Sequence, residues 1–109
     1  MHYYADDAAL VVKPDIIATG KANIRTAFLT ISDHFQDRLR VDQVEIRVIE
    51  GGGNAQVIME TVLHFPDAEG QMITTTRRAS CVFRKEPDGR WLCTIDNAYG
   101  TALLDSDAV

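Results

Sequence analysis

The sequence predicts an α+β domain in which one helix covers a face of an antiparallel sheet. Residues 21–35 repeat apolar side chains with the period of one helical face. Residues 41–99 contain four segments in which apolar and polar side chains alternate, separated by short turns rich in Gly, Pro and Asp. This order of elements is typical of a helix packed on a meandering sheet. The 109 residues suffice for one hydrophobic core, so we expect a single domain over residues 1–109.

Two short strands are expected before the helix. Asp6 and Asp7 predict a break after the aromatic start of the chain, and residues 8–13 (AALVVK) then predict a first strand. A Pro-Asp turn follows and leads to a brief second strand over residues 16–18.

The helix is expected to begin after Gly20, which can serve as its N-cap. Apolar side chains then recur at intervals of three or four positions and define one face. They are Ile24, Ala27, Phe28, Ile31 and Phe35. The other side of the helix is polar, so one side should lie on the sheet and the other should face water.

Residues 41–50 and 55–65 predict the next two strands, joined by a Gly-Gly-Gly-Asn hairpin turn. In the first, Val44, Ile46 and Val48 alternate with polar residues, which is typical of a half-buried strand. One face of the second strand is expected to contribute to the core. Its side chains are Val57, Met59, Thr61, Leu63 and Phe65.

Residues 71–85 and 91–99 predict a long hairpin whose turn sets the register. Pro87, Asp88 and Gly89 fit a type I turn closed by a glycine at positive φ, which makes a three-residue loop. The expected opposed pairs are Lys85 with Trp91, Phe83 with Cys93, Cys81 with Ile95, Ala79 with Asn97 and Arg77 with Tyr99. Opposed residues share a face, so this inner face is apolar near the turn and polar at its far end.

Asp96 falls on the other, outer face in this register. We expect it opposite Ser80 and diagonal to Arg78, where a cross-strand ion pair with Arg78 is its favoured role. A β-bulge near Asn97 would instead turn Asp96 to the inner face. Glu60 is also predicted to point outward.

Apolar side chains on the outer face predict a partner surface. They are Ile58, Val62, Met72, Val82 and Leu92. We interpret this face as the interface of a homodimer packed sheet against sheet. The alternative is that scattered apolar residues on a surface have no partner.

Composition excludes several classes of function. A net charge of −5 and a pI near 5.0 disfavour binding to nucleic acid or to an anionic membrane. No apolar run approaches the ~20 residues that span a bilayer, and no signal peptide is recognisable, so we expect a cytoplasmic protein.

Cys81 and Cys93 are expected to be free, because their diagonal placement strains a disulfide. His2, His34 and His64 lie on different elements, so neither a metal site nor a cofactor is predicted.

Several short stretches together resemble the SnoaL-like, ketosteroid isomerase-like branch of the nuclear transport factor 2-like superfamily. They are residues 4–8 (YADDA), 20–24 (GKANI), 78–84 (RASCVFR), 88–91 (DGRW) and 95–97 (IDN). The resemblance extends from about Tyr3 to Leu104 and implies a cystatin-like fold, in which a cone-shaped, curved sheet encloses an apolar pocket against helices. That family begins with a long helix over the pocket mouth. Here only residues 1–4 could be its last turn, so the resemblance implies a truncated N-terminal helix.

The resemblance also implies that Asn97 lines the pocket, because it lies two residues past the core aliphatic residue of the final strand. Together with Tyr99 and Arg77 it would orient a polar group of a ligand, although Asn97 and Tyr99 could instead only satisfy backbone groups at a strand end. The expected pocket walls are Val57, Met59, Phe83, Trp91 and Ile95.

No catalytic residue can be assigned from the sequence. The residues to consider are Asp96 and His34. Ketosteroid isomerase and its relatives use carboxylic acids in the apolar cone, which is the reason to consider Asp96. His34 lies at the edge of the apolar helix face, from which it could reach the pocket rim.

Three functions stay open at this stage. The favoured one is a domain that binds a small, mostly apolar ligand, with no reaction assigned. The alternative is an isomerase, cyclase or lyase that moves a proton next to a carbonyl, which requires a carboxylate or histidine in the cone. The third is a structural dimerisation module with a filled core.

Overall fold

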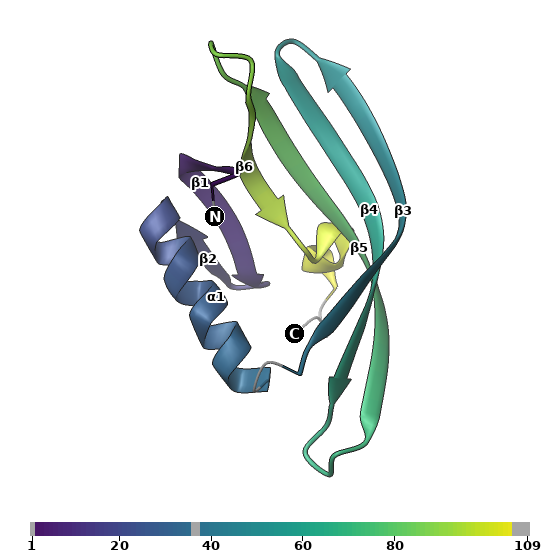
Figure 1. Cartoon of the computed structure of the whole chain (residues 1–109). Coiled ribbons are helices and arrows are strands. Elements are labelled where there is room, and N and C mark those ends of the chain that lie inside the picture. Colours follow the sequence, from purple (N-terminus) through teal and green to yellow (C-terminus); the bar gives the residue numbers. More distant parts are fainter. Residues whose placement is uncertain (1, 36–37, 106–109) are drawn as a thin grey trace.

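The computed structural model describes residues 2–35 and 38–105, apart from the side chains of residues 32, 34 and 35. In this part of the chain, strands dominate and a single α-helix accompanies them (Figure 1). The elements are β1 (Tyr4–Lys13), β2 (Ile16–Thr19), α1 (Lys21–Phe35), β3 (Arg40–Gly51), β4 (Asn54–Pro66), β5 (Met72–Lys85), β6 (Trp91–Asn97) and the 3₁₀ helix η1 (Gly100–Leu104).

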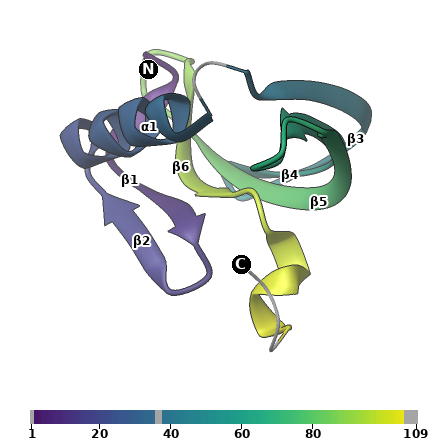
Figure 2. The same ribbon diagram turned by 90° about the horizontal axis from the view of Figure 1, so that it is seen from below.

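The strands form one six-stranded sheet in the order β2-β1-β6-β5-β4-β3. Neighbouring strands are antiparallel except β1 and β6, which are parallel, so the first and last strands lie side by side. The sheet curves, and α1 lies on the side toward which it curves (Figure 2). The predicted α+β class, a curved sheet packed against a helix, is confirmed.

The helix α1 packs on β1 and β2 and buries the core of the domain. Gly20 caps it as predicted, because the Gly20 carbonyl accepts the first helical hydrogen bond from Ile24 N at 3.0 Å. Ile24 is fully buried between the helix and the sheet. The core cluster consists of Tyr4, Ala5, Ala8, Leu10, Ile24, Val57, Cys81 and Cys93. We call the sheet face that carries this cluster the inner face, and the opposite one the outer face.

The start of β1 differs from the prediction. Tyr4 already belongs to the strand, whereas Asp6 and Asp7 were expected to precede it. These two residues lie within a register irregularity between Tyr4 and Ala9, so the strand passes through the acidic pair rather than beginning after it.

The hairpin turn between β5 and β6 forms as expected. Glu86 N donates to the Arg90 carbonyl at 2.7 Å and Gly89 N donates to the Glu86 carbonyl at 2.9 Å. Gly89 adopts a φ of 89°, which side chains other than hydrogen rarely allow. The local sequence therefore determines this turn.

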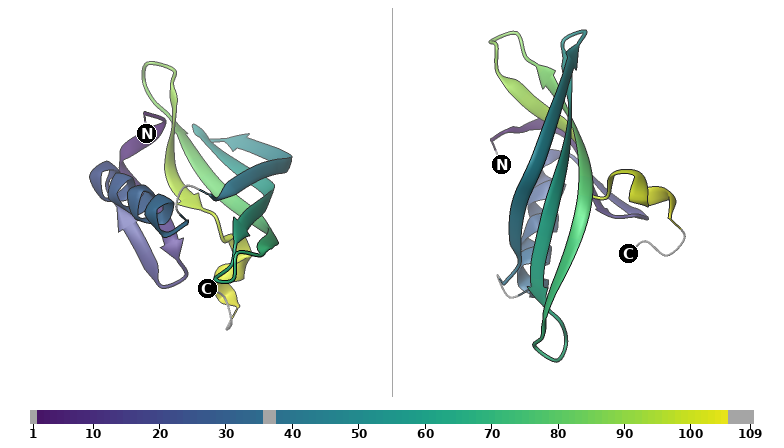
Figure 3. Two further views of the ribbon diagram at one scale, coloured as in Figure 1. Left: turned by 60° about the horizontal axis from the view of Figure 1, so that its bottom comes forward. Right: turned by 90° about the vertical axis from the view of Figure 1, so that its right-hand side faces the viewer.

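Strand β3 differs from its expected half-burial, since every residue of it is exposed. Val44, Ile46 and Val48 retain 60%, 50% and 57% of their accessible surface. The physical reason is visible in Figure 3, where α1 lies over β1 and β2 and does not reach across the sheet to β3. Alternation produces burial only where a second layer covers the apolar face.

No helix among the described residues is long and apolar enough to cross a membrane.

Candidate functional site

A β-bulge in β6 turns Asp96 toward the inner face. Phe83 pairs with Cys93 as expected, but the register then shifts and Cys81 pairs with Asp96 rather than with Ile95. Thr94 is the extra residue, and its Oγ1 donates to the Val82 carbonyl at 3.1 Å. The predicted register is therefore wrong beyond Cys93, and the faces of the following residues are exchanged.

Asp96 lies among hydrogen-bond donors on this face. The buried Tyr4 hydroxyl donates to Asp96 Oδ2, and the buried Cys81 thiol donates to Asp96 Oδ1 at an S···O distance of 3.4 Å. Parallel pairing of β1 with β6 positions Tyr4 next to Cys93, and Cys93 N donates to the Tyr3 carbonyl at 2.7 Å. Asp96 itself is partly accessible. The carboxylate thus combines buried partners with access from outside.

Both donors stay protonated at neutral pH. The pKa of Tyr4 is raised well above its ordinary value of 10.0, first by burial and then by the hydrogen bond and the negative charge of Asp96. The pKa of Cys81 is raised by its hydrogen bond with Cys93, by burial and by the charge of Asp96. The two groups therefore serve as donors to the carboxylate rather than as bases or thiolate nucleophiles.

The structure corrects the predicted role of Asp96. It was expected to point outward and to pair with Arg78, but Arg78 Nε instead contacts Glu60 Oε1 at 3.2 Å. Glu60 points outward as predicted, opposite Arg78 in the β4–β5 register. The bulge at Thr94 is the physical reason for the exchange.

Asn97 is the last residue of β6 and lies on the outer face, opposite Ser80. Its Oδ1 accepts hydrogen bonds from Tyr99 N at 3.1 Å and Gly100 N at 3.0 Å, and its Nδ2 donates to the Gly100 carbonyl at 3.2 Å. The amide therefore satisfies backbone groups where the strand ends, which was the alternative to the predicted role in orienting a ligand.

Arg77 and Tyr99 lie close together, although they are not the opposed strand pair that the sequence predicted, because β6 ends at Asn97. The Arg77 guanidinium carbon lies 4.1 Å from the centroid of the Tyr99 ring, within the range of a cation–π contact. The Tyr99 hydroxyl donates to the Val12 carbonyl of β1 at 3.4 Å, so the ring bridges β1 and β5 beyond the end of β6.

The expected wall residues divide between the two faces. Val57 is buried in the core, and Met59 and Phe83 pack against it from the inner face. Trp91 is half-buried at the start of β6, opposite Lys85. Ile95 lies opposite Val82 with 48% of its surface exposed, so the bulge places it on the outer face. His34 belongs to α1, but its side chain is outside the described part of the structure.

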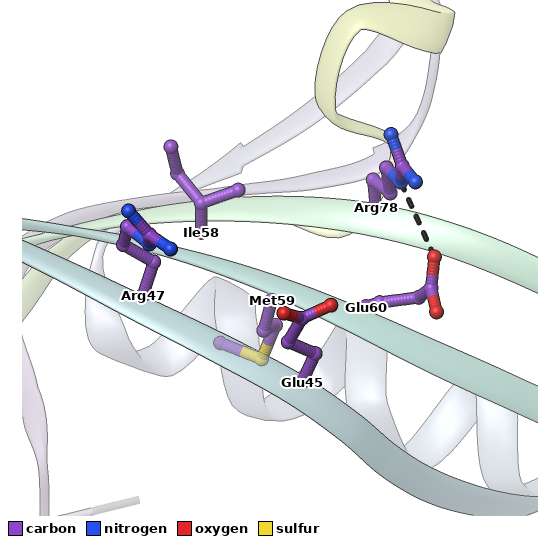
Figure 4. Close-up of a pocket in the computed structure, with 6 residues that line it drawn as sticks. All are labelled: Glu45, Arg47, Ile58, Met59, Glu60 and Arg78. Carbon is purple, nitrogen blue, oxygen red and sulfur yellow. Dashed lines mark hydrogen bonds and ion pairs between the residues drawn. The ribbon is translucent and has the colours of Figure 1, made fainter.

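An open groove of about 300 Å³ lies over β3, β4 and β5 (Figure 4). Its lining residues are Glu45, Arg47, Ile58, Met59, Glu60 and Arg78. Charges of both signs line the groove beside Ile58, and the Glu60–Arg78 pair lies at one end. Apart from Met59, these residues lie on the outer face, so the groove belongs mainly to the surface that was predicted to bind a second copy.

A second polar cluster lies at the other end of β3. His64 Nε2 contacts Asp42 Oδ2 at 2.9 Å and His64 Nδ1 lies 3.3 Å from Thr74 Oγ1. Among the described residues no group of three or more His, Cys, Asp or Glu side chains is arranged to hold a metal ion. The cluster is a cross-strand contact between β3, β4 and β5.

Sequence reasoning missed Tyr4 as the partner of Asp96. No sequence signal could have identified the pair, because residues 93–96 alternate like a regular strand and nothing marks Thr94 as an extra residue. The pairing also depends on β1 lying beside β6, and the two side chains are 92 residues apart in the chain.

The arrangement offers a defined chemistry. Asp96 has unused lone pairs on both oxygens, so it can accept a hydrogen bond from a ligand or a proton from a carbon acid. Val57, Met59 and Phe83 supply apolar surface beside it. An apolar body with one polar group is therefore the kind of ligand that the inner face suits.

Solved structures with the same fold include proteins of several kinds. A nuclear transport factor 2-like protein with a cystatin-like fold from Novosphingobium aromaticivorans is similar over 94% of this chain and 72% of its own, with a TM-score of 0.71 and 19% identity. A candidate ketosteroid isomerase from Shewanella frigidimarina covers 87% of this chain and 74% of its own, with a TM-score of 0.73 and 15% identity. The association domain of C. elegans CaMKII covers 88% and 74%, with a TM-score of 0.63 and 20% identity.

These comparisons show the fold. The chain has the cystatin-like fold of nuclear transport factor 2-like proteins, as the resemblance implied. No protein-family model matches the sequence, and no curated protein is a significant match.

Proposed function

We propose that the inner face binds a small, mostly apolar ligand through a hydrogen bond to Asp96. The observation that carries this proposal is a partly accessible carboxylate held by two buried donors beside apolar side chains of the inner face. Ligand sites in proteins combine apolar walls with a few placed polar groups, and this face has both. Met59 and Phe83 would contact the apolar body of the ligand.

Proton transfer next to a carbonyl is the second candidate, and the inward position of Asp96 favours it. In such a step the carboxylate takes a proton from the carbon beside the carbonyl and the electron pair forms an enolate. The protonated Asp96, whose proton can exchange with solvent because the residue is partly accessible, then delivers a proton to another carbon. The protonated Tyr4 hydroxyl keeps the carboxylate in place. The candidate ketosteroid isomerase with this fold supports the reaction class.

We also propose that two copies associate through their outer faces. Ile58 and Ile95 are exposed there, and the charges of Glu45, Arg47 and the Glu60–Arg78 pair offer complementary contacts under two-fold symmetry. An association domain among the structures of this fold supports an oligomer. Sedimentation equilibrium should give twice the chain mass, and a monomer at micromolar concentration would contradict the proposal.

The free thiols fit a reducing compartment, which supports a cytoplasmic location.

A thermal-shift panel of steroid ketones, aromatic polyketides and terpenoid epoxides tests the ligand proposal. A ligand at a hundredfold excess over its Kd adds about 2.7 kcal/mol of stability, which raises the Tm of a small domain by on the order of 10 °C. Asp96→Asn should reduce this rise, whereas the outer-face control Glu60→Gln should retain it. No rise with any compound would contradict ligand binding.

The second candidate has its own readout in the same samples. In D₂O, NMR should show the proton beside the ketone carbonyl exchanging, and Asp96→Asn should slow this by on the order of 10²-fold. Binding without exchange would leave the first function and reject the second.

A further inference from the structure

Arg77 lies on the same face as Asp96, at the other end of an apolar row. It shares the inner face with Ala79 and Cys81, because alternate residues of a strand point to the same side. Cys81 pairs with Asp96 and lies four positions from Arg77, so the two charged positions are about 13 Å apart along β5. Ala79 and its partner Met59 lie between them. The inner face thus carries an anion and a cation separated by apolar surface.

Arg77 differs from most arginines of the sheet in having no acidic partner, and from Arg47 in being half-buried. Arg78 pairs with Glu60, and the remaining ion-paired arginines are Arg40 with Asp42, Arg84 with Asp7 and Glu86, and Arg90 with Asp88. Among the described residues no carboxylate forms an ion pair with Arg77, although its side chain is half-buried. Arg47 also has no ion pair, but it is exposed, so water solvates its charge. A half-buried guanidinium without a counter-ion leaves a charge whose solvation is incomplete.

The aromatic platform fixes the position of this cation. The Tyr99 ring is held by its hydroxyl at the Val12 carbonyl and by its backbone N–H at Asn97 Oδ1. The guanidinium lies against this ring, which leaves its N–H edges for a partner. Thr61 lies directly opposite Arg77, and Gln43 opposite Thr61, so further hydrogen-bonding side chains share this row.

We propose that the ligand of the inner face is an amphiphilic carboxylate, with its acid group on Arg77 and a hydroxyl or keto group at Asp96. A guanidinium binds a carboxylate through two parallel N–H···O bonds, which gives both charge and direction. The apolar body would lie over Met59 and Ala79. This inference rests on the proposed inner-face site and adds the chemical class of what occupies it.

Two matched probes test the inference: 6-hydroxy-2-naphthoate and its neutral amide, 6-hydroxy-2-naphthamide. Each has a rigid apolar body with a hydroxyl at one end, and they differ only in the charge at the other. Titration calorimetry at pH 7.5 should show the carboxylate binding at least about tenfold more tightly than the amide, because the ionic hydrogen bonds to Arg77 are lost in the amide.

Substitutions of Arg77 test whether this residue causes the preference for the carboxylate over the amide. Arg77→Gln should remove the tenfold preference while it leaves the amide affinity unchanged, and Arg77→Lys should keep part of the preference. Arg78→Gln, a neighbouring change on the outer face, should leave both affinities as they are. If Arg77→Gln does not fold, the wild-type preference and the Arg77→Lys variant decide the question.

The outcomes separate the two proposals. Equal affinity for both probes in the wild type, or an unchanged preference in Arg77→Gln, would overturn the carboxylate inference and leave inner-face binding intact. Failure of both probes to bind would count against the inference, while the steroid, polyketide and epoxide panel independently decides whether the inner face binds ligands at all.

Discussion

The part of the sheet that α1 covers and the uncovered part, which we call the wing, differ in how far their apolar side chains are buried. In the covered region, α1 packs on β1 and β2, β6 lies beside β1, and residues such as Ile24 and Cys93 have almost no exposed surface. In the wing, formed by β3 and the adjacent part of β4, apolar side chains alternate just as regularly, yet Ile46 is half exposed. The difference shows that the second layer, and not the strand pattern, decides which apolar residues become core.

The polar contacts differ in the same way. Asp96, in the covered region, accepts hydrogen bonds from two buried side chains. Glu60, in the wing, pairs with an Arg78 side chain that is 80% exposed. The Asp96 hydrogen bonds should therefore contribute more to stability than the Glu60–Arg78 ion pair. Water competes strongly with the exposed ion pair and much less with hydrogen bonds from buried donors.

The largest expected effect compares isoleucines of the two regions. Ile24→Ala should lower the free energy of unfolding by about 2–5 kcal/mol, because it leaves a cavity between α1 and the sheet. Ile46→Ala should cost less than about 1 kcal/mol, since half of the side chain already contacts water. Urea denaturation of the two variants measures the difference. Equal losses would show that the wing is covered by another chain in solution.

A carboxylate-to-amide change in each region should give the next largest contrast. Asp96→Asn should cost about 1–3 kcal/mol, because the amide cannot accept from both Tyr4 and Cys81 as the carboxylate does. Glu60→Gln should change stability by less than about 0.5 kcal/mol. Both values come from the same denaturation experiment, and a reversed order would contradict the hydrogen-bond network around Asp96.

The smallest expected effect is a loss of stability at alkaline pH. The unfolded chain releases the Tyr4 proton near pH 10.0, whereas the folded chain keeps it because its pKa is raised. Stability from Tyr4 is therefore fully present below pH 10 and declines above it, by about 1.4 kcal/mol per pH unit. Denaturation between pH 8 and 11 should show a shallower decline in Tyr4→Phe, and parallel declines would reject the buried phenol as the cause.

Local sequence signals predicted most of the fold. Gly20 marks the helix start, and the Pro87, Asp88 and Gly89 turn sets the first pairs of the last hairpin, because backbone conformations at such positions depend on neighbouring residues only. The same turn gave a wrong register beyond Cys93, where Thr94 is an extra residue. Local signals also failed at β3, where burial depends on how far the helix reaches.

The sequence by itself determined the order of the elements, the turns and the alternation of faces within each strand. Only the tertiary structure decided which face Asp96 occupies, through the extra residue Thr94 and the parallel contact of β6 with β1. The physical reason is that a bulge reverses every later face without changing the local pattern, and its stabilising partner Tyr4 lies at the opposite end of the chain.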